Sequence, residues 1–361
     1  MTCGQPCVLG PCAQAIVHPV VSNMDRSLKI GIYRPLRMPE SFRVCVDNIG
    51  AERARGGVHL THFDSKDIVP DDVDCYWDPR SGGGSPPAEF VLRADKPCVV
   101  TVHGVAPMEI PFEYGSGVVE TIKLIAANRK KRKVWRRFGG HYAAIVTGSQ
   151  FSKVNIAKHL PIDPERIFVG SYAVNHDLFK PRTLAAEGRY FLHVSNNEPR
   201  KNLRRIVAAY RALDTENKPG LWLKLRNGAH FETVPGVQVI DRRLGDGEIA
   251  ELYAGAFAFV FPSLYEGFGL PILEAMASGC PVITSDTTAC AEVAGGAAIT
   301  VNPRSVDAIS GAMQTLCRSE ARRKELIRSG LSRAKLFTWE KAGEAYRAVF
   351  EGAARASYET R

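Results

Sequence analysis

Two glutamates, Glu266 and Glu274, stand eight positions apart on either side of a glycine-rich turn. Gly267 and Gly269 in that turn allow a backbone to approach a ligand closely. Leu270 and the proline after it predict a helix start, and the free N–H groups and positive dipole end of such a helix suit a phosphate. Carboxylates accept hydrogen bonds from hydroxyl groups, although a dipole or capping role is the alternative for either glutamate alone. The pattern therefore predicts a site for a pyrophosphate between hydroxyl-bearing groups, as in a nucleotide sugar.

Two cations, Arg200 and Lys201, follow the apolar run 189–194. An amphipathic pattern over 203–213 predicts a helix directly after them. Cations at such a strand-to-helix junction suit a pyrophosphate, because arginine can grip two oxygens and lysine acts as a point charge. Ordinary solvated charge is the alternative interpretation.

A histidine, His103, ends the strongly β-prone run 97–102. The carboxyl end of a parallel strand faces the crevice in which such sheets bind ligands, so this side chain is a candidate for ligand contact. A structural histidine is the alternative. The Pro- and Gly-rich segment 105–116 is expected to be an active-site loop.

Strands and helices in alternation must bring these residues together. Apolar runs typical of buried strands lie at 28–33, 58–63, 97–102, 142–147, 167–172, 189–194, 222–225, 237–240, 257–261 and 280–284. Helical patterns separate many of these runs, which indicates an α/β protein with parallel sheets. A chain of 361 residues is too long for one ordinary core. We therefore expect two domains, residues 24–182 and 183–340, with residues 1–23 as a disordered leader.

Composition narrows the class of protein. Hydrophobic residues make up 45% and charged residues 24% of the chain, and no apolar run approaches the length of a membrane span. The formal net charge of +9 favours anionic partners. The nine cysteines include no C-x2-C pair, which predicts reduced thiols of a cytoplasmic protein and no zinc site. The formal D-x-D pattern Asp72-Val-Asp74 is interpreted as a solvated turn, so no metal site is predicted.

A basic cluster lies within the predicted helix 118–138. It occupies 129–137 and contains Trp135. A solvated helix face is one interpretation, and peripheral contact with an anionic membrane, with Trp135 at headgroup depth, is the other. No nucleic-acid-binding motif occurs, so nucleic acid is not expected as a partner.

Several of these stretches together resemble the large retaining glycosyltransferase family numbered 4. The resemblance spans about residues 95–350 and rests on the Glu-x7-Glu run 262–274, Gly-Cys-Pro-Val-Ile-Thr-Ser at 279–285, Glu-Val-Ala-Gly-Gly at 292–296, Thr-Val-His-Gly at 101–104, Glu-Pro-Arg-Lys-Asn at 198–202 and Phe-Thr-Trp-Glu at 337–340. Several relatives carry arginine where Ser195 stands here, and many carry a glycine pair in the first loop that this chain lacks.

The resemblance implies a GT-B fold, in which two Rossmann-like domains face a cleft and a last helix at about 341–356 packs back on the first domain. Glu274 would hold the ribose hydroxyls. The two catalytic candidates, Glu266 and His103, would contact the donor sugar from opposite sides. The groups implied to bind the donor diphosphate are Lys201 first, then Arg200, and the backbone of Gly267, Phe268, Gly269 and Leu270.

The resemblance also implies the reaction. A hexose moves from a nucleotide sugar to a saccharide or lipid-linked saccharide with retention at the anomeric carbon, without metal, and without a cofactor because the nucleotide sugar is itself a substrate. GDP-mannose is the first expectation for the donor, from the likeness to mannosyltransferases of surface-polysaccharide assembly. Two alternatives remain open: a UDP-sugar-dependent transferase or epimerase of the same fold, and a non-catalytic scaffold that binds nucleotide sugars.

Overall fold

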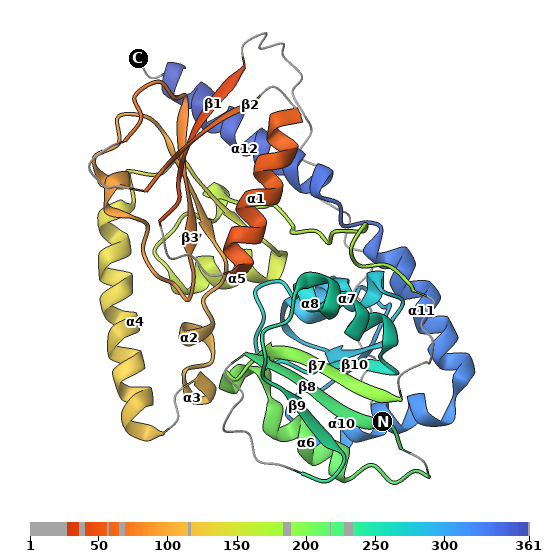
Figure 1. Cartoon of the computed structure of the whole chain (residues 1–361). Helices are drawn as coiled ribbons and strands as arrows, with labels where there is room; N and C mark the ends of the chain where they lie inside the picture. Colours follow the sequence, from red (N-terminus) through yellow and green to blue (C-terminus); the bar gives the residue numbers. More distant parts are fainter. Residues whose placement is uncertain are drawn as a thin grey trace, which may run out of the picture.

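The computed structural model describes residues 27–35, 40–55, 58–64, 69–114, 117–182, 189–216, 218–226 and 234–359 (Figure 1). The expected leader, residues 1–23, lies outside the described residues. Two separate six-stranded sheets, each parallel throughout, form the centres of two lobes.

The first sheet has the strand order β2-β1-β3-β4-β5-β6. Its strands are β1 (Leu28–Tyr33), β2 (Val58–Phe63), β3 (Cys75–Ser81), β4 (Cys98–Val102), β5 (Ala144–Thr147) and β6 (Ile167–Val169). The helices of this half are α1 (Glu40–Arg55), α2 (Ala106–Glu109), α3 (Pro111–Tyr114), α4 (Val118–Phe138) and α5 (Gln150–His159), with short 3-10 turns at Glu89–Leu92 and Pro164–Arg166.

The second sheet has the strand order β12-β11-β10-β7-β8-β9. Its strands are β7 (Tyr190–Asn196), β8 (Gly220–Arg226), β9 (Val237–Ile240), β10 (Ala258–Phe261), β11 (Val282–Ser285) and β12 (Ile299–Val301). The helices are η3, a 3-10 turn (Pro199–Lys201), α6 (Leu203–Arg211), α7 (Asp246–Gly255), α8 (Leu270–Ala277), α9 (Thr288–Ala294), α10 (Val306–Arg318), α11 (Glu320–Ala334) and α12 (Trp339–Glu359).

The central strands are buried on both faces, which explains their unbroken apolar sequences. All four residues of β10 are buried. Phe259 packs in the same core as α7 and α8, whereas Val260 belongs to the core beneath α6 and α10. The two-residue period of a strand thus distributes one apolar run between two helical layers.

The last helix, α12, returns to the first half of the chain. It lies against α1, β3, β4 and β5, and Tyr346 and Phe350 pack on Trp77 of β3. Figure 1 shows α11 beside the second lobe and α12 crossing to the first. Within the described residues, no helix is both long enough and apolar enough to cross a bilayer.

One expected loop is partly helical. Residues 105–116 were predicted as an irregular active-site loop, but α2 and α3 form there. Each has a proline in its first turn, where the missing N–H is not needed. Ala106 and Ile110 are buried against Leu264 and Tyr265 of the second lobe. Burial of these apolar side chains stabilises structure that the Pro- and Gly-rich composition did not indicate.

Candidate active site

The glycine-rich turn after β10 touches the first lobe directly. A Cβ atom on Gly267 would lie 2.0 Å from the backbone oxygen of His103, so no larger residue fits there without movement. The Gly267 carbonyl accepts hydrogen bonds from the hydroxyls of Ser149, at 2.7 Å, and Ser152, at 2.8 Å. The turn is therefore held against the carboxyl end of β4 and the start of α5, at the boundary between the two sheets.

Two further contacts join the lobes beside this turn. The Tyr265 hydroxyl accepts a hydrogen bond from the Val105 amide at 3.1 Å. The Glu292 carboxylate, from α9, accepts from the amides of Gln150 and Phe151 at 2.9 and 3.0 Å. A carboxylate at the N-terminus of α5 satisfies free donors and complements the helix dipole. The sequence analysis did not single out Ser149, Ser152 or Tyr172, but all three contact site residues.

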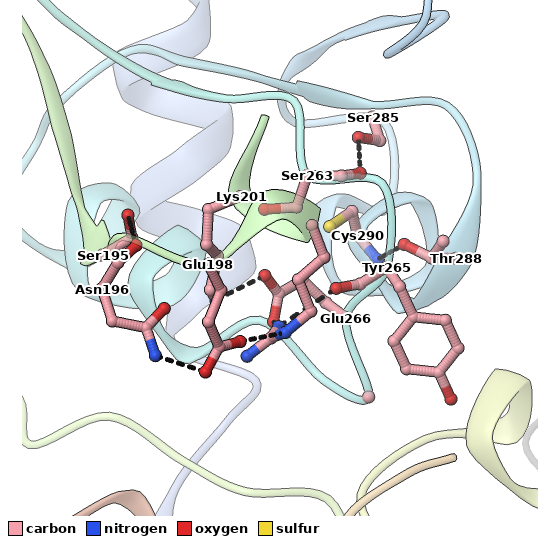
Figure 2. A network of polar contacts seen from close by, with 12 residues as sticks. Ser195, Asn196, Glu198, Lys201, Ser263, Tyr265, Glu266, Ser285, Thr288 and Cys290 are labelled. Atoms are coloured by element: carbon pink, nitrogen blue, oxygen red, sulfur yellow. Dashed lines mark hydrogen bonds and ion pairs between the residues drawn. The ribbon is translucent and has the colours of Figure 1, made fainter. Parts of the chain in front are cut away.

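Glu266 is the centre of a buried ion cluster (Figure 2). Its carboxylate accepts from Lys201 Nζ at 2.6 Å and from an Arg200 guanidinium nitrogen at 3.1 Å. Burial raises the pKa of the Glu266 carboxyl, but the Lys201 and Arg200 charges outweigh that effect and hold it below its usual range. Lys201 and Arg200 lie 65 and 66 positions before Glu266 in the sequence, and the fold joins these two cations and the carboxylate in one cluster.

Arg200 has several partners besides Glu266. Its Nε donates to Glu198 at 2.6 Å and a terminal nitrogen donates to the Tyr265 carbonyl at 3.2 Å. Glu198 in turn accepts from the side-chain Nδ2 of Asn196 at 2.6 Å. Burial lowers the pKa of the Arg200 guanidinium, yet the nearby carboxylates more than offset this and raise it, so the group stays charged. Sequence reasoning did not single out Glu198, although its place two residues before Arg200 was a usable signal.

Glu274 has a hydrogen-bond partner outside this ion cluster. It projects from α8 and accepts a hydrogen bond from the Tyr253 hydroxyl of α7 at 3.0 Å. Burial raises the pKa of the Glu274 carboxyl to about 7, with only partial compensation from the Tyr253 hydrogen bond. The site thus contains two glutamates with opposite shifts, one ionised beside cations and one that titrates near neutral pH.

His103 has protein partners on both ring nitrogens. Nε2 lies 2.7 Å from the Pro79 carbonyl, and Nδ1 lies 2.5 Å from the Tyr172 hydroxyl. The ring also stacks on Phe42, with centroids 3.6 Å apart. Burial lowers the pKa of His103 to about 4, so the ring is neutral, donates from Nε2 and accepts at Nδ1. Contact with a donor sugar remains a prediction for this residue.

The remaining predicted residues lie on the same turn. Gly269 has a φ of 110° and precedes α8, a conformation that favours glycine. Leu270 begins α8 and packs at the edge of the core. The Phe268 side chain is buried against Tyr172 and Phe337, so its contribution to a ligand site is limited to its backbone.

Beside the ion cluster, one buried polar atom, Asn196 Oδ1, has no hydrogen-bond partner among the described residues. The Ser195 hydroxyl lies 2.7 Å from Nε2 of His193. Burial lowers the pKa of His193 to about 4, so this pair adds no positive charge. Lys201 and Arg200 are therefore the cations of this part of the site.

A hollow of about 820 Å³ lies in the second lobe between β9 and α7. Asp241, Arg242 and Leu244 line one part of it, and the stacked rings of Tyr190 and Trp222 line another. None of the predicted site residues borders this hollow.

Two other predictions concern the D-x-D pattern and Trp135. Lys29 pairs with Asp72 at 2.6 Å, and its amide donates to Asp74 at 2.8 Å, so the D-x-D pattern holds a lysine. Across the described ranges, no group of three or more His, Cys, Asp or Glu side chains could hold a metal ion. The expectation that Trp135 lies at headgroup depth is wrong, because the ring is 1% exposed and donates to the Gly84 carbonyl at 3.0 Å.

Comparison with known proteins adds a family. Residues 189–319 match the family described as glycosyl transferases group 1. The chain is 35% identical over 219 residues to O-antigen chain mannosyltransferase B of Escherichia coli, covering 54% of this chain but only 57% of that relative. It is 30% identical over 275 residues to the MMP alpha-(1->4)-mannosyltransferase of Mycolicibacterium hassiacum, covering 73% of this chain and 67% of the relative.

Solved structures support the fold. Sucrose-phosphate synthase from Thermosynechococcus elongatus superposes with a TM-score of 0.71 at 17% identity, covering 90% of this chain and all of the other. WaaG, a glycosyltransferase involved in lipopolysaccharide biosynthesis, gives a TM-score of 0.63 at 14% identity, covering 89% of this chain and 98% of that one. The expected GT-B architecture is thereby confirmed. The chain belongs to the group 1 glycosyltransferases, with the GT-B fold and the sequence features of family 4.

Proposed function

We propose that this chain transfers a hexose, with GDP-mannose as the first candidate donor, to a saccharide or lipid-linked saccharide in the assembly of a surface polysaccharide or glycan. The observation that carries the proposal is the Glu266 ion cluster, placed beside a glycine turn and a helix start at the boundary between two parallel sheets. Several relatives are named as O-antigen or other mannosyltransferases, and these names favour mannose over other hexoses.

Donor binding would exchange partners within the cluster. The diphosphate would replace Glu266 as the partner of Lys201, and of Arg200 in part, assisted by N–H groups of the turn 267–270. The Glu266 carboxylate, released from its cations, would accept hydrogen bonds from hydroxyls of the sugar. The two cations would then stabilise the negative charge that develops on the leaving diphosphate. They supply this charge without a metal ion.

The other glutamate and the histidine would position the donor. Glu274, on the first turns of α8, would accept from the ribose hydroxyls. His103 would contact the sugar from the first lobe after the Tyr172 hydroxyl turns away from Nδ1. The acceptor hydroxyl would attack the anomeric carbon on the face from which the diphosphate departs. The departing phosphate oxygen would take the acceptor proton, and the anomeric configuration would be retained.

The proposal also concerns where in the cell the protein acts. Exposed basic side chains in 129–137 would hold the protein at the cytoplasmic face of an anionic membrane, where a lipid-linked acceptor is presented. Nucleic acid has no part in the proposal.

Donor binding tests the proposal. Calorimetry with UDP-, GDP- and ADP-sugars should identify one binder, and a concentration a hundredfold above its dissociation constant should add about 2.7 kcal/mol to the free energy of unfolding. Lys201→Ala and Glu274→Ala should weaken that binding, whereas Lys324→Ala, on the exposed face of α11, should not. Product formed without an acceptor would indicate an epimerase. A folded protein that binds none of these sugars would contradict the transferase.

A further inference from the structure

Exposed apolar side chains are concentrated at one place on the surface. Phe112 is 76% exposed, Val118 78%, Val119 67% and Ile122 62%. These four residues, here called the apolar tip, are four of the seven large apolar side chains that are strongly exposed among the described residues. They fall within eleven positions of sequence at the end of α3 and the first turns of α4. Such a cluster typically marks a binding surface, because single exposed apolar residues are otherwise scattered.

The apolar tip continues into a basic surface on the same helix face. At 3.6 residues per turn, Val118, Ile122, Arg129, Lys133 and Arg136 fall within an arc of about 60° around the axis of α4. All five are exposed. The buried residues of α4, Thr121, Asn128, Trp135 and Phe138, lie outside this arc. The outward face of α4 is thus apolar at its start and basic over its second half.

The charge on this face is of one sign. The basic section contains six exposed side chains: Arg129, Lys130, Arg132, Lys133, Arg136 and Arg137. No acidic residue occurs between positions 121 and 138. Arg132 donates to the His159 carbonyl, and none of the other five side chains forms an ion pair with a described residue. Lys131 differs, because its Nζ turns inward to the Gly83 carbonyl at 2.8 Å. A second copy of this chain would present the same positive charge and be repelled, whereas an anionic bilayer is complementary.

The apolar tip also adjoins the candidate active site. Helix α3 packs against η3, the turn that carries Arg200 and Lys201. Tyr114, two residues after Phe112, hydrogen-bonds with Arg200, and Glu113 pairs with Arg304 of the second lobe. Figure 1 shows α4 along the outer side of the first lobe, with its start next to α3. A surface that binds at the tip therefore lies close to the ion cluster.

We propose that the apolar tip inserts into an anionic lipid bilayer while the basic half of α4 binds its headgroups. The inference rests on the membrane contact in the proposed function and moves the inserting group from Trp135, which is buried, to Phe112, Val118, Val119 and Ile122. Helix α4, with 21 residues, extends over about 32 Å. Lying along the membrane, it brings the segment from α3 to η3 to the lipid surface, so an acceptor carried by lipid meets the candidate active site without leaving the bilayer.

Vesicle sedimentation of the full chain tests the proposal, with phosphatidylcholine vesicles that contain or lack phosphatidylglycerol. The tip variant changes Phe112, Val118, Val119 and Ile122 to serine. Its partition onto the anionic vesicles should fall at least about tenfold, because burial of large apolar side chains drives interfacial binding. Changing Lys130, Lys133 and Arg136 to glutamate should lower partition about a hundredfold or more. The matched control Val154→Ser/Leu336→Ser, at side chains 64% and 52% exposed elsewhere, should bind like the wild type.

Tryptophan fluorescence can detect insertion of the apolar tip directly. The emission of Phe112→Trp should shift to the blue when anionic vesicles are added, because the indole enters an apolar environment. Wild-type protein that fails to bind, or a tip variant that binds as the wild type does, would overturn the proposal. A tip variant that turns a wild-type dimer into a monomer would overturn it in favour of self-association. Donor calorimetry without lipid should be unchanged in the tip variant, so failure of the lipid arm is distinguishable from failure of the transferase proposal.

Discussion

Replacing Glu274 with glutamine is expected to stabilise the protein above pH 7 while it weakens donor binding. Burial, only partly offset by the Tyr253 hydroxyl, raises the pKa of this carboxyl from 4.5 to about 7 in the folded protein. Each unit of pKa corresponds to about 1.4 kcal/mol, so ionised Glu274 costs the folded state about 3 kcal/mol. Glutamine keeps an acceptor for Tyr253 and carries no charge, so it removes this cost.

The sign of the pH dependence follows from proton counting. Between pH 4.5 and about 7 the folded state binds more protons at Glu274 than the unfolded state. The contribution of Glu274 to the free energy of unfolding therefore falls as pH rises through this window and is constant above it. In Glu274→Gln this decline is absent. The variant should be similar to the wild type at pH 4.5 and more stable by about 3 kcal/mol at pH 8.

Urea unfolding of both proteins at several pH values measures the difference directly, because the other titrating groups cancel between them. The matched control is Glu248→Gln on the neighbouring helix α7. Glu248 is exposed, and its hydrogen bonds with Arg242 and the Gly245 amide lower its pKa, so this variant should show no stabilisation at high pH. Parallel pH profiles for Glu274→Gln and the wild type would refute the raised pKa of the Glu274 carboxyl. Undiminished donor affinity in Glu274→Gln would argue against its role at the ribose.

Three further changes test contacts of the site. Lys201→Met should destabilise the protein by about 3 kcal/mol, because it removes the 2.6 Å partner of buried Glu266. It should also abolish donor binding. Urea unfolding measures the first effect and calorimetry the second, and an unaltered free energy of unfolding would contradict the ion pair. Gly267→Ala places a Cβ 2.0 Å from the His103 oxygen, so small-angle scattering should show the lobes further apart and transfer should be lost. An unchanged scattering curve with full activity would show that the turn does not pack there. Tyr172→Phe removes the hydrogen-bond donor to His103 Nδ1 and should lower the free energy of unfolding by about 1 kcal/mol. In the wild type, NMR should show the His103 imidazole titrating near pH 4, and a titration near 6.5 would contradict the buried neutral ring.

Much of the fold was predictable because its signals are local. The strands Leu28–Tyr33, Val58–Phe63 and Val237–Ile240 and the helix Val118–Phe138 have the predicted bounds. Parallel strands buried on both faces leave short apolar runs, and an amphipathic helix leaves its period in the sequence. The prediction of a loop over α2 and α3 was wrong, because apolar contacts with the other lobe stabilise this segment and the local composition does not show them.

The sequence by itself determined which residue types flank the turn: two glutamates, two cations and the glycines that let backbones approach. Only the tertiary structure decided their partners. Lys201 faces Glu266 across 65 positions, and His103 meets Tyr172 across 69. It also turned Trp135 inward and left Val118 and Ile122 outside. The reason is physical: periodicity specifies which side of an element is buried, but the pKa of a carboxyl and the contacts of a ring depend on distant segments that the packing of both sheets brings within a few ångströms.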